Sequence, residues 1–338
     1  MKNCLTVLVG AQAATPKAAP VCARLELTVK QLGTLVILLS SMFASPTLLA
    51  AEGEIAVIYP DIGEPYRQVF DSIIQGVESK VGTSVAKFPV QSETNVAELK
   101  ETLKRNNTKV AIALGRQGMQ AATALNNGIG IVVGGVLTVP ESEARGQTAI
   151  SLAPDPALLF ARIRLMLPNT RRIYVIYDPT INGWLMKLAR EAARSMGIEL
   201  VLHEAQDLRS AVKLYKSVFS VANGGRDVLW LPQDATTVEE STVLPMVLQE
   251  SWNHNIAVFS SNSALVRRGV LFSLYPDNVG LGKSLAGLAL GILQSRDYVR
   301  LGRMPLRDVQ SAINLRTAKH LEIDPSRLKN FDSTFPER

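Results

Sequence analysis

Cysteine and histidine are scarce in this sequence, and their scarcity argues against several kinds of site. The chain has two cysteines and three histidines among 338 residues. A structural zinc centre needs about four such ligands close together, so no metal site is predicted. The histidines (His203, His254 and His320) are scattered, and we find no Gly-x-Ser-x-Gly nucleophile motif. We therefore expect no catalytic site, no metal and no cofactor.

The net charge of the chain is also small when the N-terminal segment is left out. The whole chain has a formal net charge of +6, and residues 1–50 supply +3 of it, leaving +3 for the remainder. That excess is too small to indicate a nucleic-acid partner. A composition of 47% apolar and 20% charged residues is typical of a globular protein rather than a disordered one.

A long apolar run occupies residues 32–50, after Lys30, and is interrupted by serines and by Pro46. This order predicts a secretory signal peptide at residues 1–51 and export to the periplasm. A retained membrane anchor is the alternative, although the run falls short of the about 20 uninterrupted apolar residues that a span needs. Both cysteines precede residue 51, so the mature chain would have none. The segment before Lys30 is long, and we expect the true start near Val29.

Beyond residue 52, strand and helix patterns alternate. Continuous apolar runs at residues 55–59 (IAVIY) and 173–177 (IYVIY) predict strands buried on both faces. Repeated βαβ units predict an α/β protein with parallel sheets and right-handed crossovers. The pattern restarts after residue 150, so we predict two doubly wound parallel-sheet lobes joined by three crossings. The predicted ranges are 52–150 plus about 275–303 for lobe 1, and 151–270 plus about 304–338 for lobe 2.

The stretch from residue 269 to 321 predicts a strand, a turn and a glycine-rich helix. Glycines in a helix interior cost about 1 kcal/mol each relative to alanine, so we expect another backbone to pass close to this helix. The apolar face of the helix consists of Leu281, Leu285, Leu288 and Ile292. The glycines of the helix are Gly280, Gly287 and Gly291.

A nucleotide-binding loop is the competing interpretation of the same stretch. Gly282, Lys283 and Ser284 lie between a predicted strand and a predicted helix, as in a phosphate-binding loop. That motif requires a further glycine five residues before the second one, and the position holds Asp277. A carboxylate there would repel phosphate, so no nucleotide binding is predicted.

The string at residues 312–319 (AINLRTAK) points to a family. After a strand, a tyrosine, a glycine-rich helix and a basic loop, it resembles the C-terminal signature of the solute-binding proteins of ABC importers that include tryptophan and tyrosine binders. The resemblance covers nearly the whole chain after Glu52. It implies a periplasmic-binding-protein type I fold, a small-molecule ligand between the lobes, ABC permease subunits in the inner membrane as partners, and a monomer. The chain departs from the family at Asp178–Asn182 and at Arg116, which leaves the ligand open.

Polar residues follow many of the predicted strands. Carboxyl ends of parallel strands share one edge of a sheet, which is where such folds bind ligands. Arg116 could hold a carboxylate, Asp178 or Asp234 an ammonium group, and a tyrosine (Tyr59, Tyr177 or Tyr275) an aromatic or apolar portion. Helix capping is the alternative for any single Asp, Asn, Ser or Thr. The predicted ligand-binding residues are Asp61, Arg116, Gln117, Tyr177, Asp178, Thr180, Asn182, Asp234, Thr236, Ser261, Asn262 and Tyr275.

The function predicted is therefore that of a periplasmic solute-binding component of an ABC importer, with an amino acid or related carboxylate as ligand. The alternative is a periplasmic sensing or interaction module that serves a receptor or sensor kinase. The sequence does not separate the two, because one fold supports both functions. A transcription-factor effector domain would need a helix-turn-helix before the first strand, and the segment there is apolar and export-like.

Overall fold

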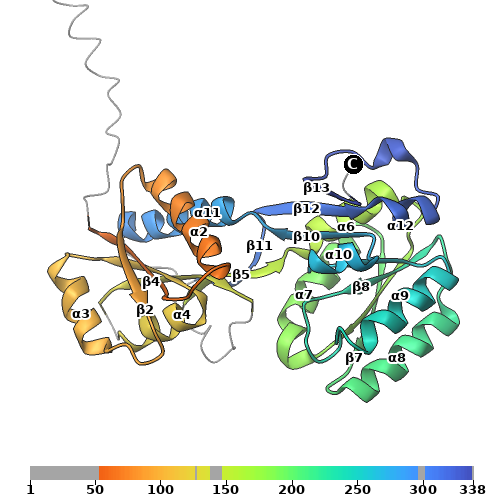
Figure 1. Cartoon of the computed structure of the whole chain (residues 1–338), viewed down its shortest axis with the longest axis horizontal. Coiled ribbons are helices and arrows are strands. Elements are labelled where there is room, and N and C mark those ends of the chain that lie inside the picture. The colour runs from red at the N-terminus through yellow and green to blue at the C-terminus, as the bar shows by residue number, and fades with distance from the viewer. Residues whose placement is uncertain (1–52, 126–127, 138–146, 296–300, 337–338) are drawn as a thin grey trace, which may run out of the picture. The chain divides into compact units, whose positions relative to one another are not determined.

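The computed structural model describes residues 53–125, 128–137, 147–295 and 301–336. The predicted signal peptide lies outside these residues. The described chain forms two sheets, each with helices on both faces (Figure 1). No helix within the described ranges is long and apolar enough to cross a membrane. The α/β class that the sequence predicts is confirmed.

The first sheet has six parallel strands in the order β11-β5-β4-β3-β1-β2. Helices α2 and α11 cover one face, and α3 and α4 cover the other. The strands are β1 (Ile55–Pro60), β2 (Ala86–Val90), β3 (Val110–Leu114), β4 (Gly130–Val136), β5 (Thr148–Pro154) and β11 (Gly302–Leu306). The helices are α2 (Tyr66–Val81), α3 (Val96–Arg105), α4 (Gly115–Ala124) and α11 (Asn278–Gln294).

Strand β1 shows why the apolar runs are continuous. Ile55 and Val57 pack with the helices on one face, whereas Ala56 and Ile58 pack with those on the other. Successive side chains of a strand point to opposite faces, so a strand covered on both sides needs apolar residues at every position. The same pattern in the sequence predicts a parallel sheet.

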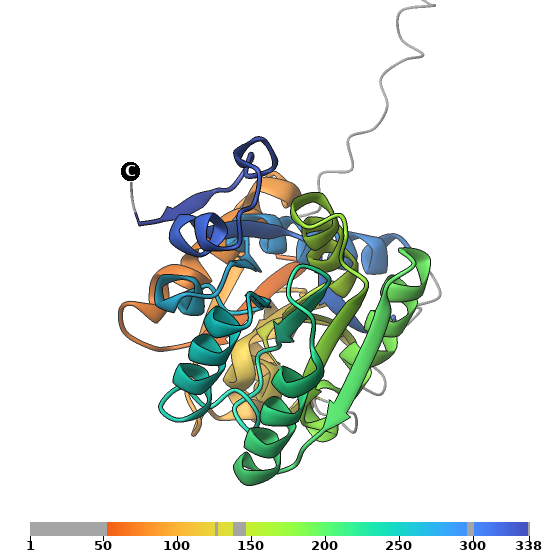
Figure 2. The same ribbon diagram turned by 90° about the vertical axis from the view of Figure 1, so that its right-hand side faces the viewer.

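The second sheet has seven strands in the order β13-β12-β10-β9-β8-β6-β7, and β12 runs antiparallel to β10. Figure 2 shows this sheet from the side, with the short C-terminal strand β13 at its edge. The strands are β6 (Arg172–Tyr177), β7 (Glu199–Glu204), β8 (Asp227–Leu231), β9 (Ala257–Ser260), β10 (Phe272–Pro276), β12 (Val309–Asn314) and β13 (Ser333–Phe335).

Apolar cores form on both faces of the second sheet. Helices α6, α7 and α12 contribute to the core on one face, and α8, α9 and α10 to the core on the other. The cores include stacked rings of Trp230, Phe259 and Phe272, with Phe160 of α6 meeting Trp230 edge-on at 5.6 Å. The helices are α6 (Pro156–Met166), α7 (Pro179–Ser195), α8 (Leu208–Val221), α9 (Val243–Asn253), α10 (Ala264–Arg268) and α12 (Leu315–His320), followed by the 3-10 turn η2 (Pro325–Arg327).

The chain passes between the two sheets three times, after β5, β10 and β11, as predicted. Backbone hydrogen bonds join these passages. The Asp155 amide donates to the Leu306 carbonyl at 2.8 Å, and the Asp277 amide donates to the Asp308 carbonyl at 3.0 Å. The segment after β11 is therefore hydrogen-bonded to the segments after β5 and β10. The residue ranges given for the two lobes stay a prediction.

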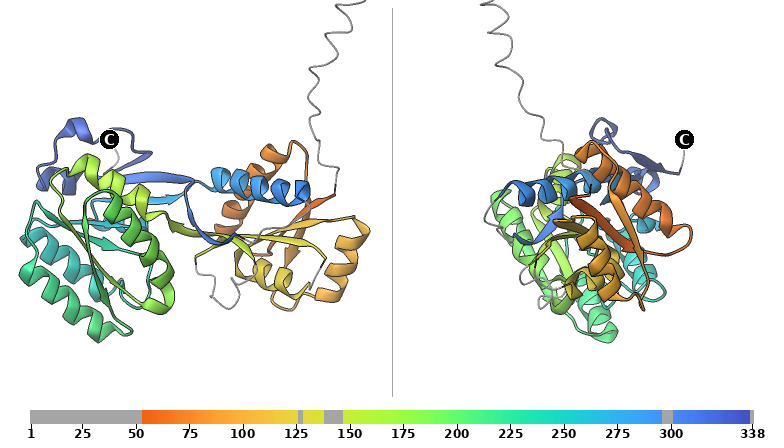
Figure 3. Two further views of the ribbon diagram at one scale, coloured as in Figure 1. Left: turned by 180° about the vertical axis from the view of Figure 1, so that it is seen from behind. Right: turned by 90° about the vertical axis from the view of Figure 1, so that its left-hand side faces the viewer.

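Helices α2 and α11 cross at glycines. A Cβ at Gly76 would overlap the carbonyl oxygen of Val279, and a Cβ at Gly282 would overlap that of Ile73. The two helices lie side by side in Figure 1 and Figure 3. The close approach predicted for this helix therefore exists, but it occurs at Gly282.

The prediction of a close backbone was wrong for Gly287 and Gly291, because no atom lies within 4 Å of a Cβ at either position. A Cβ at Gly280 would meet side chains, with Asp308 Cβ at 2.9 Å, rather than another backbone. The carboxylate of Asp277 caps α11, with Oδ1 accepting from the Gly280 amide at 3.1 Å. A negative charge therefore already occupies the helix start that a phosphate would need.

Candidate functional site

Two aspartates organise the loops that follow β6 and β8. Asp178 is 7% exposed and Asp234 is 5% exposed. The Asp178 amide donates to Asp234 Oδ2 at 2.7 Å, and Thr236 Oγ1 donates to Asp178 Oδ2 at 3.0 Å. Each loop therefore uses its aspartate to hold the other loop, across more than fifty residues of sequence.

Each carboxylate also fixes its own backbone. Oδ1 of Asp178 accepts from the amide and the hydroxyl of Thr180, so Asp178 caps α7. Oδ1 of Asp234 accepts from the amides of Thr236 and Thr237. The Asn182 amide group donates to Asp234 Oδ2 at 3.1 Å and to the Gln233 carbonyl at 3.2 Å. We call the set Asp178, Thr180, Asn182, Asp234 and Thr236 the aspartate network.

The hydrogen bonds of the network decide the charge of Asp178. Burial by itself raises the pKa of this carboxyl, but hydrogen bonds from Thr180 and Thr236 outweigh burial, so the pKa lies below its usual value. Asp178 therefore stays ionised at neutral pH, with its charge compensated by donors of its own chain. The network brings together five of the twelve residues predicted from the sequence.

The other predicted residues of the second sheet are engaged as well. Ser261 is buried, and its Oγ accepts from the Trp230 indole at 3.2 Å. Asn262 Oδ1 accepts from the Ala264 amide at 3.0 Å, at the start of α10. The Tyr275 hydroxyl lies 3.2 Å from Ser333 Oγ of β13.

Tyr177 is a buried tyrosine at the end of β6. Its hydroxyl donates to Glu204 Oε1 at 2.8 Å, and the residue is 2% exposed. Burial first, and the Glu204 carboxylate second, raise the pKa of Tyr177 to about 12. The ring packs in a core on one face of the second sheet.

The predicted residues of the first sheet lie at the carboxyl ends of β1 and β3. Asp61 accepts a hydrogen bond from Gln91 Nε2 at 2.9 Å, and Gln117 Nε2 donates to Ser92 Oγ at 3.2 Å. The loop after β2 therefore joins the loop after β1 and the first turn of α4. Arg116 is exposed, and no other described residue bonds to its guanidinium. Gln117 Oε1 is buried and has no hydrogen-bond partner among the described residues.

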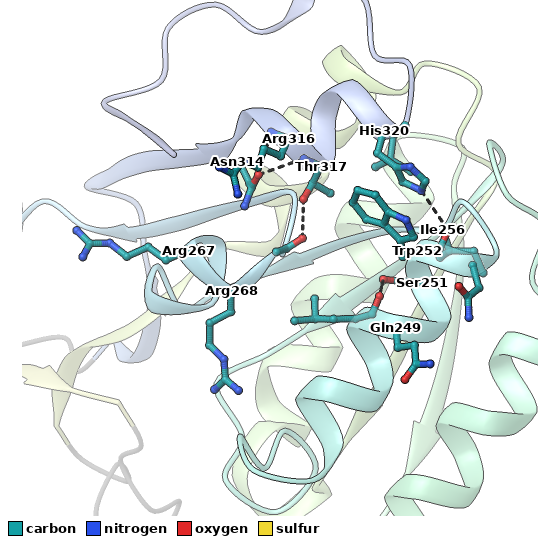
Figure 4. Close-up of a pocket in the computed structure, with 14 residues that line it drawn as sticks. Gln249, Ser251, Trp252, Ile256, Arg267, Arg268, Asn314, Arg316, Thr317 and His320 are labelled. Carbon is teal, nitrogen blue, oxygen red and sulfur yellow. Dashed lines mark hydrogen bonds between the residues drawn. The ribbon is translucent and has the colours of Figure 1, made fainter. Parts of the chain in front are cut away.

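Two cavities lie at the other edge of the second sheet, among the amino ends of β8, β9 and β10. Their volumes are about 440 and 270 Å³. In the larger one, shown in Figure 4, Trp252 and His320 stack with ring centroids 3.5 Å apart. Arg267 and Arg268 point in different directions in this view, and Arg268 pairs with Glu240 at 3.1 Å. None of the twelve predicted residues lines either cavity.

Gln91 and Ser92 were not among the predicted site residues, yet they bond to the predicted residues Asp61 and Gln117. Both residues directly follow β2, which ends at Val90, so they lie at a strand end. Within the described ranges, no three histidine, cysteine or acidic side chains are grouped so that they could hold a metal ion.

Two α/β sheets joined by three crossings, with polar loops at the carboxyl ends of their strands, define a periplasmic-binding-protein type I fold. The model of the ABC transporter substrate binding protein family matches residues 75–327, which is more than half of the chain. The chain therefore belongs to this family, which is one of substrate-binding proteins rather than of enzymes. The resemblance seen in the sequence is confirmed. No curated protein matches the chain significantly in sequence.

Several solved structures share the fold at low sequence identity. A conserved domain protein from Vibrio cholerae is 20% identical, with 83% of this chain and 98% of that chain covered and a TM-score of 0.50. An ABC domain from Streptococcus pneumoniae in complex with L-Trp is 17% identical, with 84% and 100% covered and a TM-score of 0.51. The ligand-free, open structure of CD0873, a substrate binding protein with adhesive properties from Clostridium difficile, is 17% identical, with 82% and 98% covered and a TM-score of 0.57.

Proposed function

We propose that this protein is the periplasmic solute-binding component of an ABC importer and that it binds an amino acid or a related small carboxylate. The observation that carries the proposal is the family match, which gives the chain a solute-binding role. The L-Trp complex of the Streptococcus pneumoniae relative supports an amino acid as the ligand. Export, a monomeric state and docking on ABC permease subunits in the inner membrane are parts of the same proposal.

The ligand would bind at the carboxyl ends of the strands, where the twelve predicted residues lie. Arg116 is the candidate for the ligand carboxylate, because its guanidinium is exposed and bonds to no other described residue. The aspartate network supports a different role for Asp178 and Asp234 from the direct ammonium contact that the sequence suggested. Their oxygens already accept hydrogen bonds from the chain, so we propose that they hold the loops in place.

A thermal-shift screen of the purified protein tests the solute-binding function. The panel consists of amino acids, peptides, nucleosides and sugars. A ligand present at 100 times its Kd should stabilise the folded state by about 2.7 kcal/mol. A rise in Tm with one chemical class supports solute binding and identifies the ligand. A flat response across the whole panel would contradict it and favour the sensing or interaction module.

A further inference from the structure

The larger cavity at the amino edge of the second sheet has no role in the proposed function. Its volume is about 440 Å³, which lies within the range of about 300–1,000 Å³ that small-molecule sites occupy. Helix α9, the end of α10 and helix α12 line it (Figure 4). The twelve predicted ligand-binding residues lie elsewhere, so a ligand in this cavity would be a second one.

Contacts between the walls hold this cavity together. Thr317 Oγ1 of α12 donates to the Gly269 carbonyl at the end of α10, at 2.8 Å. On the other side, the ring of His320 stacks on Trp252 of α9, and its Nε2 lies 3.1 Å from the Trp252 carbonyl oxygen. A carbonyl oxygen only accepts, so Nε2 carries the proton of this hydrogen bond. The cavity is therefore preformed, as ligand sites in proteins usually are.

The charged groups around this cavity are positive. Among the described residues, three arginines and no acidic side chain line it. Arg268 is paired with Glu240 at 3.1 Å, and the guanidinium of Arg267 lies over the Phe335 ring, 4.7 Å from its centroid. Arg316 is exposed, and its guanidinium forms no hydrogen bond or ion pair with another described residue. Arg316 is therefore the cation that a ligand can pair with.

Apolar side chains supply much of the remaining lining, among them Leu248, Ile256 and Leu321. Trp252 adds an indole ring and is 50% exposed, although one face of the ring stacks on His320. Covering apolar surface stabilises a complex by about 25 cal/mol per Å². A ligand with an apolar body would therefore bind more tightly than a bare ion.

The smaller neighbouring cavity has a different charge. It shares His320 and Leu321 with the larger one. Among the described residues, its charged lining consists of Glu322 and of Asp227, which is paired with Arg172 at 2.6 Å. The Glu322 carboxylate repels an anion at close range. An anionic ligand is therefore expected in the larger cavity and not in the smaller one.

From these observations we propose that the larger cavity is a second ligand site, which binds a small organic anion. The guanidinium of Arg316 holds the carboxylate or phosphate group of the ligand, and the apolar body of the ligand lies against Leu248 and Trp252. This inference goes beyond the proposed solute-binding function, because the site lies at the other edge of the second sheet from the predicted ligand-binding residues.

Fluorine NMR of the purified protein labelled with 5-fluorotryptophan tests the site. The chain has three tryptophans, and the variant Trp252→Phe identifies the resonance of Trp252. The probes are benzoate and phenyl phosphate, with benzyl alcohol as the neutral ring and inorganic phosphate as the anion without a ring. We expect benzoate or phenyl phosphate to shift the Trp252 resonance saturably, with a Kd about ten-fold or more below those of both control probes. The tighter of the two anions shows whether the site prefers a carboxylate or a phosphate.

Two glutamine variants of helix α12 test the role of Arg316. Arg316→Gln removes the proposed partner of the anion, and Lys319→Gln is the matched control, because Lys319 is an exposed cation of the same helix that does not line the cavity. Arg316→Gln should weaken binding of the anion about ten- to hundred-fold, as expected for a lost charge-assisted hydrogen bond. Lys319→Gln should leave the Kd within about two-fold, because solvent screens an exposed charge.

Three results would overturn the second site. They are a Trp252 resonance that neither anion shifts saturably, equal Kd values for benzyl alcohol and the anions, and equal effects of the two glutamine variants. Arg316 is exposed, so its replacement leaves the fold intact and the comparison stands. The readout is local to Trp252, so a flat thermal-shift panel, which would contradict the proposed function, leaves this test unaffected.

Discussion

Asp178 and Asp234 show what the sequence does and does not reveal about a single residue. Both positions were predicted at strand ends, because a polar residue after a buried strand is visible in the sequence. Their partners were not predictable, since Asp178 bonds to Asp234 and Thr236 across more than fifty residues. Aspartate is favoured both for capping helices and for binding ligands, so only the fold distinguishes these roles. The positions of these residues at strand ends were therefore predictable, whereas the hydrogen-bond partners of each side chain were not.

The lowered pKa of Asp178 predicts a pH dependence of stability. A carboxyl whose pKa is lower in the folded state stabilises the fold above its unfolded pKa of about 3.9, and that contribution is lost as pH falls through the folded pKa. As pH falls below 5, the free energy of unfolding should therefore decrease less for Asp178→Asn than for the unmodified protein. Denaturant titrations at several pH values measure this difference. Asp71→Asn, at an exposed position of α2, is the control, and equal acid sensitivity of Asp178→Asn and the unmodified chain would contradict the prediction.

Arg116 carries the prediction for ligand affinity. Removal of a charge-assisted hydrogen bond costs about 1.5–3 kcal/mol, which is about a ten- to hundred-fold loss of affinity. Arg116→Ala should therefore weaken binding of a carboxylate ligand by that factor. The unliganded Tm should hardly change, because the side chain is exposed. Calorimetry of Arg116→Ala beside Arg171→Ala, which lies at the amino end of β6, measures both effects. An unchanged affinity would remove Arg116 from the site.

Most strands and helices were predictable because burial on both faces imposes long apolar runs, as in β1 and β6. Strand β11 was missed because it is only partly buried, contains Pro305 and depends on pairing with β5, which lies far away in sequence. Strand β13, with three residues, was missed for the same reason. A run of apolar residues in the local sequence predicts a strand that is buried throughout. An edge strand depends on pairing with a strand far away in sequence, so the local sequence does not predict it.

The crossing of α2 and α11 predicts opposite effects for two glycines of one helix. Gly282→Ala should destabilise the protein by about 1–3 kcal/mol, because the new Cβ overlaps the Ile73 carbonyl oxygen and the helices must separate. Gly287→Ala, with no atom within 4 Å, should stabilise it by about 0.5–1 kcal/mol through helix propensity. Urea denaturation of both variants measures the difference. Equal effects of the two substitutions on stability would show that helix propensity, and not the crossing with α2, determines how this helix responds to alanine.

At the scale of the whole chain, the first sheet is not complete until late in the sequence. Its core includes Leu281, Leu285 and Ala289 of α11, and its edge strand is β11. A chain that ends at Pro276 should therefore fail to form the first lobe, although residues 53–154 supply five of its six strands. Limited proteolysis of that truncated chain should cut within residues 53–154, whereas the full chain should resist. Equal protection of these residues in both chains would contradict the prediction.

The return of α11 and β11 to the first sheet also sets the order of events during synthesis. Domains made from one continuous segment can fold as soon as they leave the ribosome. Here ~150 residues separate Pro154 from Leu306, a delay of about 8–30 s at translation rates of about 5–20 residues per second. During that interval the face of α2 that carries Gly76 has no partner. We therefore expect the N-terminal half of the nascent chain to stay unfolded until translation is nearly finished, and an unfolded chain is the form that can be threaded through a narrow pore.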